Sequence, residues 1–311
     1  MRRTIAVMAV LLGSACSTSG DPRPSPQVST ATGRLGGDAM AGFEASLAAD
    51  VVAPAAPPSV QSALAVLSGD VVGPPIPRDV RAPTPWLADL SWSGPQRVAH
   101  AKSARQAVVN ELFEKAGASW PPKEVLYRVF KQEREFEVWA GDGQSELKLI
   151  GTYGICAASG DLGPKRKEGD YQVPEGFYKI GYFYPTSSYY LAAQVNYPNQ
   201  SDKIRGDKTA PGSDILIHGR CASIGCISMT DERVEEIYLV GWAAFLEGKP
   251  TLIHSFPSRD IEKLRKDPKY AQHHAFWAEL EPAMTMFDEE HRIPKVQIER
   301  DGSYVVTPFG D

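Results

Sequence analysis

The segment S-D-I-L-I-H-G-R-C-A-S-I-G-C-I-S-M, Ser213 to Met229, decides how the centre of this chain folds. Its apolar start is typical of a buried strand, and that strand ends at His218. A turn containing Gly219 and Gly225 then leads to Cys226. A strand and a loop that bring an imidazole to a thiol are typical of a cysteine nucleophile and its base. The spacing therefore makes Cys226 and His218 a candidate catalytic pair.

The residues around this pair favour acyl transfer. Gly225 leaves room for backbone N–H groups to approach a developing oxyanion. A helix predicted to begin at Thr230 or Asp231 would place Cys226 near a helix N-terminus, which favours a thiolate. The alternative is a buried structural cysteine beside a core histidine, because a Cys–His pair alone does not identify a family.

Composition excludes several classes of protein. Of the 311 residues, 42% are hydrophobic and 23% are charged, which is ordinary for a globular chain of one large domain or two small ones. The formal net charge is −5, so the chain lacks the basic footprint of a nucleic-acid binder. We therefore expect no nucleic-acid partner.

The N-terminus has the pattern of an export signal. Arg2 and Arg3 precede an apolar core, and the small residues before Cys16 resemble a lipobox. We expect residues 1–15 to be a signal peptide and Cys16 to carry a lipid anchor; ordinary cleavage before Cys16 without lipidation is the alternative. Either route exports the protein to the periplasm or cell envelope.

Three cysteines remain after Cys16, an odd number for a compartment that oxidises thiols. The count fits a Cys156–Cys221 disulfide that leaves Cys226 as a thiol, and three reduced thiols are the alternative. Zinc ligation by His218, Cys221 and Cys226 would make the chain a metal-binding module, but no C-x-x-C or H-x-x-x-H element accompanies them.

The predicted organisation has a tether followed by one catalytic domain. Residues 16–85 contain eleven of the 25 prolines and can bury little, which predicts a flexible Pro/Ala/Ser-rich tether. Helical periodicity marks residues 86–123, β-rich runs mark a catalytic domain at 124–256, and residues 257–311 are predicted to form one helix and a hairpin packed on it. The predicted fold class is mainly β with appended helices, that is, α+β.

The motif H-G-R-C-A-S-I-G-C-I-S-M resembles the signature of the L,D-transpeptidase (YkuD-type) catalytic domain, in which a histidine and a short loop precede Ser-x-Gly-Cys. The segment Gly160 to Tyr178 resembles that family's P-x-G-x-(Y/F) strand and the loop before it. Further blocks at 128–139, at 196–199 and in the tail are similar to the YafK-like branch. The resemblance spans roughly residues 101–306.

The resemblance implies a β-sandwich domain that uses Cys226 as nucleophile and His218 as base. It further implies that the Gly219 carbonyl orients the imidazole, and that the amides of Gly225 and Cys226 form the oxyanion hole. Enzymes of this family attack the diaminopimelate carbonyl of a peptidoglycan stem peptide and form a thioester. Such chemistry calls for no cofactor and no metal.

Two departures leave the acceptor open. Ile224 stands where most relatives carry histidine, and Ser228 stands where they carry arginine or asparagine. An amine acceptor would make the protein a transpeptidase. The YafK-like branch suggests the alternative of a hydrolase that releases peptidoglycan-linked lipoprotein, which would then be a partner. A non-catalytic cell-wall module is the remaining alternative.

Four further residues are candidates for substrate binding. Arg220 could hold a carboxylate or form a surface salt bridge, and Lys165 could meet an anionic stem peptide or lie in a solvated loop. Ser223 could act at the site or shape the loop. Tyr197 could line a groove or pack in the core.

Overall fold

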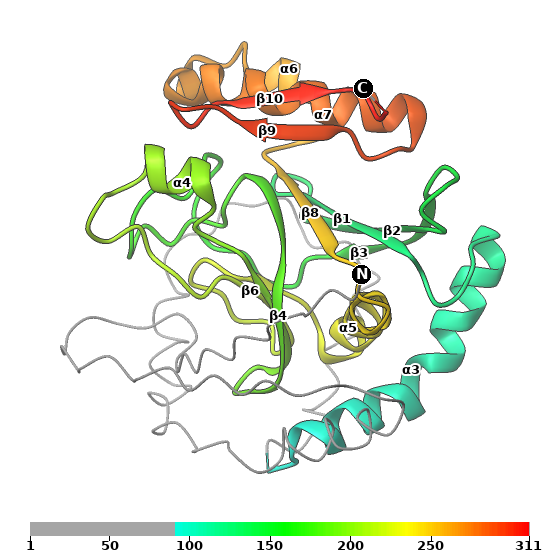
Figure 1. The fold of residues 1–311 in the computed structure, drawn as a ribbon. Helices are drawn as coiled ribbons and strands as arrows, with labels where there is room; N and C mark the ends of the chain where they lie inside the picture. The colour runs from blue at the N-terminus through cyan, green and yellow to red at the C-terminus, as the bar shows by residue number, and fades with distance from the viewer. Residues whose placement is uncertain (1–90, 311) are drawn as a thin grey trace, which may run out of the picture.

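An eight-stranded mixed sheet is the frame of the computed structural model, which describes residues 91–310 (Figure 1). Its strand order is β3-β2-β1-β8-β4-β5-β6-β7. The predicted signal peptide, the tether and Cys16 lie outside the described residues. The strands are β1 (Glu124–Phe130), β2 (Glu135–Gly141), β3 (Lys148–Gly154), β4 (Gly176–Ser187), β5 (Tyr190–Val195), β6 (Leu216–His218), β7 (Ile227–Ser228) and β8 (Thr251–Phe256).

The strands β1 and β2 are buried on both faces, whereas the edge strand β3 is mostly not. β1 pairs antiparallel with β2 and parallel with β8, so it lies between two neighbours. Six of its seven residues are buried, and its sequence E-V-L-Y-R-V-F is nearly continuous in apolar and aromatic side chains. Strands covered on both sides show such runs in place of strict alternation.

The long strand β4 joins the two halves of the sheet. Its residues 176–179 pair with β8, and its later residues pair with β5. The register shifts between Ile180 and Tyr182, so the intervening Gly181 is bulged. Beyond β5, the short parallel pair β6 and β7 completes the sheet and sets His218 opposite Ser228.

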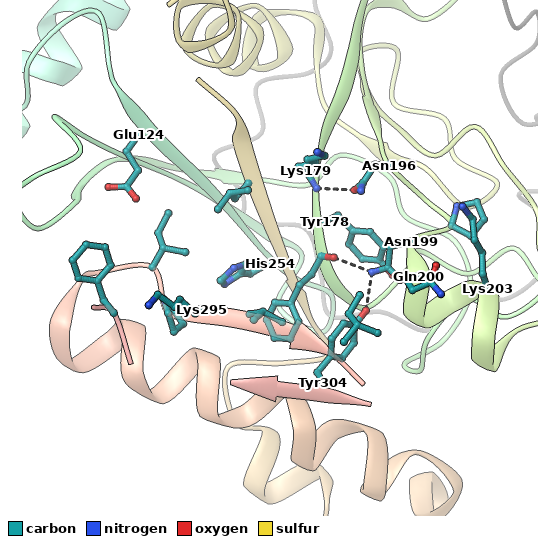
Figure 2. Close-up of a pocket in the computed structure, with 18 residues that line it drawn as sticks. Glu124, Tyr178, Lys179, Asn196, Asn199, Gln200, Lys203, His254, Lys295 and Tyr304 are labelled. Carbon is teal, nitrogen blue, oxygen red and sulfur yellow. Dashed lines mark hydrogen bonds between the residues drawn. The ribbon is translucent and has the colours of Figure 1, made fainter. Parts of the chain in front are cut away.

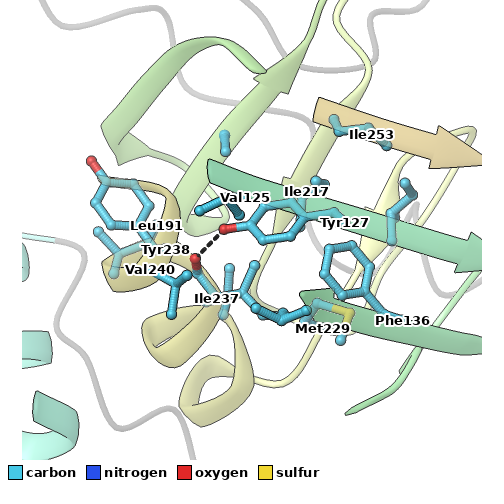
Figure 3. Packing of buried hydrophobic residues seen from close by; sticks show 14 of the residues in the cluster. Val125, Tyr127, Phe136, Leu191, Ile217, Met229, Ile237, Tyr238, Val240 and Ile253 are labelled. Atoms are coloured by element: carbon cyan, nitrogen blue, oxygen red, sulfur yellow. Dashed lines mark hydrogen bonds between the residues drawn. The ribbon is translucent and has the colours of Figure 1, made fainter. Parts of the chain in front are cut away.

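Two helices cover one face, called here the inner face, whose side chains include Tyr127, Tyr178, Ile217 and Ile253. They are α3 (Gly94–Ala116), which ends at left-handed Gly117, and α5 (Asp231–Leu246), capped by Thr230. Figure 3 shows α5 packed on the strands, with the Tyr127 hydroxyl donating to the Ile237 carbonyl at 2.6 Å. Aliphatic side chains of α5 complete this core.

The C-terminal elements cover part of the opposite, outer face (Figure 1). They are α6 (Ile261–Leu264), η1 (Pro268–His273), α7 (His274–Glu290) and the hairpin β9 (Lys295–Ile298) with β10 (Tyr304–Thr307). The fully buried Trp277 on α7 donates to the Glu175 carboxylate at 2.7 Å, which ties α7 to the residue before β4. The helix α4 (Gln200–Arg205) lies between β5 and β6 in the chain.

The prediction of one continuous tail helix is wrong. Pro268 has no amide hydrogen to donate, and the Asp267 side chain accepts from the Lys269 amide at 2.9 Å, so the chain starts a new helix there. The predicted fold class is confirmed: a mainly β frame carries helices on both faces, which is an α+β architecture. None of the helices among residues 91–310 is long and apolar enough to cross a membrane.

Candidate active site

The two predicted catalytic side chains lie on the outer face of the last two strands. β6 and β7 run parallel, and His218 is paired with Ser228. Residues two apart along a strand share a face, so Cys226 lies on the same side as Ser228 and therefore as His218. Cys226 is a fully buried thiol that packs against Ala192 and Leu216. The register of two short strands thus brings together the thiol and the imidazole that the sequence singled out.

The imidazole of His218 is oriented by the backbone that follows it. Its Nδ1 lies 2.5 Å from the Gly219 carbonyl oxygen. A carbonyl only accepts, so Nδ1 carries the hydrogen and Nε2 presents a lone pair. That Nε2 lies 3.3 Å from the Ser228 hydroxyl oxygen, and the same hydroxyl donates to the Ala222 carbonyl. An imidazole in this tautomer can accept a proton at Nε2.

Burial keeps this histidine neutral. His218 is 1% exposed, and the Tyr189 ring lies against it with centroids 4.5 Å apart. Loss of solvent lowers the pKa of His218 to about 4, while the Gly219 carbonyl favours the protonated form. The neutral imidazole therefore persists well below neutral pH.

A carboxylate at the start of α5 fixes the turn after His218. The Asp231 carboxylate accepts from the Arg220 amide at 3.0 Å and lies 3.5 Å from the Arg220 Nε. A Cβ at Gly219 would meet the same carboxylate at 2.5 Å, so only glycine fits there. Burial raises the pKa of Asp231, and the adjacent Arg220 opposes that rise. Arg220, predicted as a surface residue or substrate contact, is 8% exposed at its side chain and is used in this turn.

Ser223 shapes the loop that carries the nucleophile. Its hydroxyl donates to the Cys226 carbonyl at 2.7 Å and accepts from the Gly225 amide at 3.2 Å. Gly225 has φ of 128°, a conformation that L side chains rarely adopt. The Gly225 amide, one of the two expected oxyanion donors, is thus engaged within its own loop.

A second loop packs against the loop that carries the nucleophile. A Cβ on Gly225 would lie 3.3 Å from the Gln172 carbonyl, so the segment at Tyr171 and Gln172 packs directly over this glycine. The Ser159 hydroxyl donates to the Tyr171 carbonyl at 2.8 Å and lies 3.3 Å from the Ser223 hydroxyl. These contacts hold this segment against the loop of Cys226.

A disulfide joins Cys156 to Cys221, with their Cα atoms 5.1 Å apart. It links the end of β3 to the loop between His218 and Cys226. The zinc alternative loses one of its three ligands, because a cysteine in a disulfide has no thiolate to offer. Among residues 91–310 no group of three or more His, Cys, Asp or Glu side chains has metal-binding geometry.

Two other candidates have internal partners. Lys165 is 4% exposed, and its ammonium group contacts the Asp170 carboxylate at 2.6 Å and the Lys167 carbonyl at 2.9 Å. Tyr197 is 5% exposed and donates to the Pro211 carbonyl at 2.8 Å. The Lys165 ammonium also lies 5.9 Å from the Tyr197 ring centroid. Both side chains therefore brace the loops beside the site.

Three further side chains contact the site in roles that the sequence did not indicate. Ser228 touches His218 Nε2, Tyr189 stacks on its ring, and Asp231 holds the turn. The two-residue spacing from Cys226 is a signal that could have placed Ser228 on the catalytic face. Tyr189 and Asp231 carry no such local signal, because strand pairing and the α5 N-terminus bring them there.

Comparisons with known proteins identify the family of the chain. The model of the L,D-transpeptidase catalytic domain (YkuD) matches residues 125–240. The chain is 34% identical over 186 residues to "Putative L,D-transpeptidase YafK" of Escherichia coli (strain K12), covering 59% of this chain and 74% of that protein.

Two solved structures are more distant. The helical cell shape determining protein Pgp2 from Campylobacter jejuni is 17% identical, covers 61% of this chain and 80% of its own, and gives a TM-score of 0.35. Bd1075 of Bdellovibrio bacteriovorus is 18% identical, covers 58% and 76%, and gives a TM-score of 0.32. On the family model and the similarity to YafK, the chain belongs to the L,D-transpeptidase (YkuD) family.

Proposed function

We propose that the protein is an exported cysteine acyltransferase that acts on peptidoglycan stem peptides. One observation carries the proposal: the Gly219 carbonyl takes the Nδ1 hydrogen of His218, which leaves Nε2 as the basic atom on the face that holds Cys226. A buried, neutral imidazole on the face of a thiol is the arrangement needed to form a thiolate during attack on a carbonyl. Residues 124–256 would carry the reaction.

The proposed reaction has two halves. His218 Nε2 takes the Cys226 proton, and the thiolate sulfur bonds to the diaminopimelate carbonyl carbon. The C–N bond then breaks, the leaving amine takes the proton from the imidazolium, and a thioester remains on Cys226. An acceptor amine attacks the thioester, gives a proton to His218, and the C–S bond breaks to restore the thiol. Water in place of the amine would make the same site a hydrolase able to release a peptidoglycan-linked lipoprotein.

Ser228 supports the charged state of His218 in this scheme. Its hydroxyl donates to the Ala222 carbonyl, so the lone pairs of its oxygen face Nε2 at 3.3 Å. Once Nε2 is protonated it can donate to that oxygen. Substrate cannot reach a thiol that is 0% exposed, so chain packed over Cys226 must move during turnover; the segment at Tyr171 and Gln172, which packs against the adjacent Gly225, is the candidate for this movement.

The disulfide supports export. Structural disulfides persist in oxidising compartments and are rare in the cytosol. Together with the basic, then apolar, N-terminal sequence, the Cys156–Cys221 bond favours a periplasmic location. Acylation of Cys16 would add a lipid anchor at the membrane.

The proposal is tested with purified protein and tetrapeptide-stem muropeptides. Cys226→Ala should abolish turnover and the thioester adduct seen by mass spectrometry, because no sulfur remains to attack the carbonyl. Cys221→Ala is the control, since it removes a different cysteine of the same loop; it also breaks the disulfide with Cys156, so its turnover is measured at a temperature where thermal unfolding shows that it is folded, and there it should retain turnover. Full activity in Cys226→Ala would refute the proposal.

Product analysis assigns the acceptor in the same assay. A cross-linked or amine-exchanged product with an added amine indicates a transpeptidase. Loss of the linked residue without exchange indicates a hydrolase. Muropeptide binding without any thioester would favour the non-catalytic module.

A further inference from the structure

A cavity of about 910 Å³ lies on the outer face of the sheet, between β4, β8 and the C-terminal hairpin (Figure 2). Its size is within the range of sites that hold small ligands or peptide segments. Phe177 and His254 are paired across β4 and β8 and form part of its floor, and Tyr304 of β10 lines it from the hairpin side. The cavity is distinct from the buried environment of Cys226, which lies beyond β5 and β6.

The charged side chains around the cavity are predominantly cationic. Lys179, Lys203 and Lys295 line it, against the single carboxylate of Glu124. All three lysines are exposed, and within residues 91–310 none of their ammonium groups has an ion-pair partner. Buried lysines elsewhere are paired: Lys131 lies 3.0 Å from Glu175. In Figure 2 the three labelled lysines come from three different elements, β4, α4 and β9.

The cavity also holds an unsatisfied buried polar atom. His254 is 3% exposed, and its Nδ1 has no hydrogen-bond partner among residues 91–310. The neighbouring Asn199 amide is engaged, donating to the Phe177 carbonyl at 2.9 Å and to the Tyr304 hydroxyl at 2.8 Å. Buried polar atoms nearly always have hydrogen-bond partners, so a ligand group in the cavity would supply the partner that His254 Nδ1 lacks.

The cavity and Cys226 are connected by residues that neighbour one another on successive strands, from β4 across β5 and β6. The Asn196 amide donates to the Lys179 carbonyl at 3.0 Å, and the next strand continues with the Val195 amide donating to the Ile215 carbonyl at 2.8 Å. Beside Ile215, the Asp214 carbonyl lies 3.7 Å from the Cys226 sulfur.

The number of strands between Lys179 and Cys226 gives the distance that a substrate occupying both sites would have to span. Lys179 is separated from Cys226 by three strand spacings, roughly 14 Å in total. An extended peptide of about four residues covers that length.

We propose that this cavity is a distal subsite for the carboxylate-bearing part of the peptide whose carbonyl Cys226 attacks. The inference rests on the proposed function, since it assigns the remainder of the same substrate. Lys179 and Lys295 would attract the free carboxylates of the peptide, and its apolar portion would contact Phe177 and Tyr304. The cationic rim, the open His254 Nδ1 and the four-residue span all favour an extended anionic peptide over an apolar ligand.

Binding is measured by calorimetry in the full-length Cys226→Ala protein, where no turnover interferes. The probe is a cross-linked dimer of disaccharide-tetrapeptide muropeptides, whose second stem supplies the residues needed to span the distance from Cys226 to the cavity, compared with the same compound after amidation of its free carboxylates. The double variant Lys179→Met/Lys295→Met should weaken binding of the acidic probe about tenfold, because charge is removed while the length of the side chain is kept. The exposed Lys249→Met, outside the cavity, is the matched control and should bind as the parent does.

Two further readouts decide the inference. In the active enzyme the double variant should raise KM about tenfold with kcat little changed, as expected for lost ground-state binding. Amidated probe should bind the parent and the double variant equally. Unchanged affinity for the acidic probe in the double variant would overturn the subsite, as would equal competition by the disaccharide without peptide.

The two proposals fail differently. If the parent enzyme turns over substrate and the lysine variants bind the acidic probe as the parent does, the acyltransferase proposal is supported and the subsite is refuted. If there is no turnover but binding of the acidic probe depends on the lysines, the acyltransferase proposal is refuted and the cavity is a peptide-binding site. Thermal unfolding of each variant shows whether it remains folded, which is expected for exposed lysines.

Discussion

His218 combines two properties that seldom occur together in a base. It is 1% exposed, which disfavours a charge, yet it must hold a proton during the reaction. The Gly219 carbonyl fixes the tautomer, and Ser228 offers an oxygen to Nε2 once that atom is protonated. The site thus has a neutral resting state and local acceptors for a brief positive charge.

This environment predicts the pH dependence of catalysis. Because burial lowers the pKa of His218 to about 4, from an ordinary value of 6.5, the base form persists as the pH falls. We expect the acid limb of kcat/KM for muropeptide turnover to lie near pH 4, since that limb reports the base of the unbound enzyme. Circular dichroism at each pH checks that the protein is folded. A limb near pH 6.5 would show that the imidazole is solvated in the active enzyme.

Individual side chains show what residue type can and cannot predict. Cys226 and His218 could be selected from the sequence because few side chains perform nucleophilic and basic roles. Lys165 was expected to have either a substrate or solvent around it, and it is buried against Asp170. The partner of a charged side chain depends on how two loop segments meet, and no local pattern records that.

At the scale of elements, the turn between β6 and the nucleophile loop depends on α5. Asp231 is the first residue of α5, and its carboxylate contacts the turn that follows His218. The orientation of the catalytic histidine is therefore coupled to the position of a helix on the inner face.

Gly219→Ala tests this coupling. Its Cβ would lie 2.5 Å from the Asp231 carboxylate and 3.2 Å from the Tyr189 carbonyl, so the turn or the helix must shift. We expect a loss of about 1–3 kcal/mol in the free energy of unfolding and a fall in kcat. Gly181→Ala is the control, because a Cβ there meets its neighbours at 3.5 Å or more and should leave both quantities nearly unchanged. Equal effects in the two variants would contradict the role of this contact.

Elements with a clear hydrophobic periodicity could be predicted from the sequence, and elements that are uniformly buried or very short could not. The helix predicted to begin at Thr230 or Asp231 matches α5, which is capped by Thr230. The strand β5, Y-L-A-A-Q-V, was missed because it is buried along nearly its whole length and shows no alternation. The six-residue α4 is too short for helical periodicity to appear.

At the scale of the whole molecule, the proposed catalytic residues and the cavity lie on the same face of the sheet, the outer face. Cys226, His218 and the cationic cavity all lie there, while α3 and α5 complete the core on the inner face. The sequence could indicate the family and could single out Cys226 and His218, which the fold places on one face of the sheet. It could not indicate the cavity, because its walls come from β4, β8, α4 and the hairpin, which are far apart in the chain.

The disulfide is expected to contribute strongly to global stability. It joins residues 65 positions apart, and closing a loop of that length removes about 4 kcal/mol of unfolded-state entropy at ordinary temperature. The double variant Cys156→Ala/Cys221→Ala should lose a comparable free energy of unfolding in urea titrations. Reductant should destabilise the parent protein and leave the double variant unaffected. A parent protein equally stable with and without reductant would contradict this expectation.

The Cys156–Cys221 bond also has a consequence for the order of events during biogenesis. A secretory channel passes the chain in an extended form. The reducing cytoplasm keeps the thiols of Cys156 and Cys221 reduced, so the disulfide does not form there. The polypeptide would therefore lack the cross-link, and its added stability, for as long as it waits to be translocated. Oxidation on the far side then supplies that stability after passage is complete. With the proposed export, the bond would make maturation directional, so that the protein acquires its final stability only after translocation.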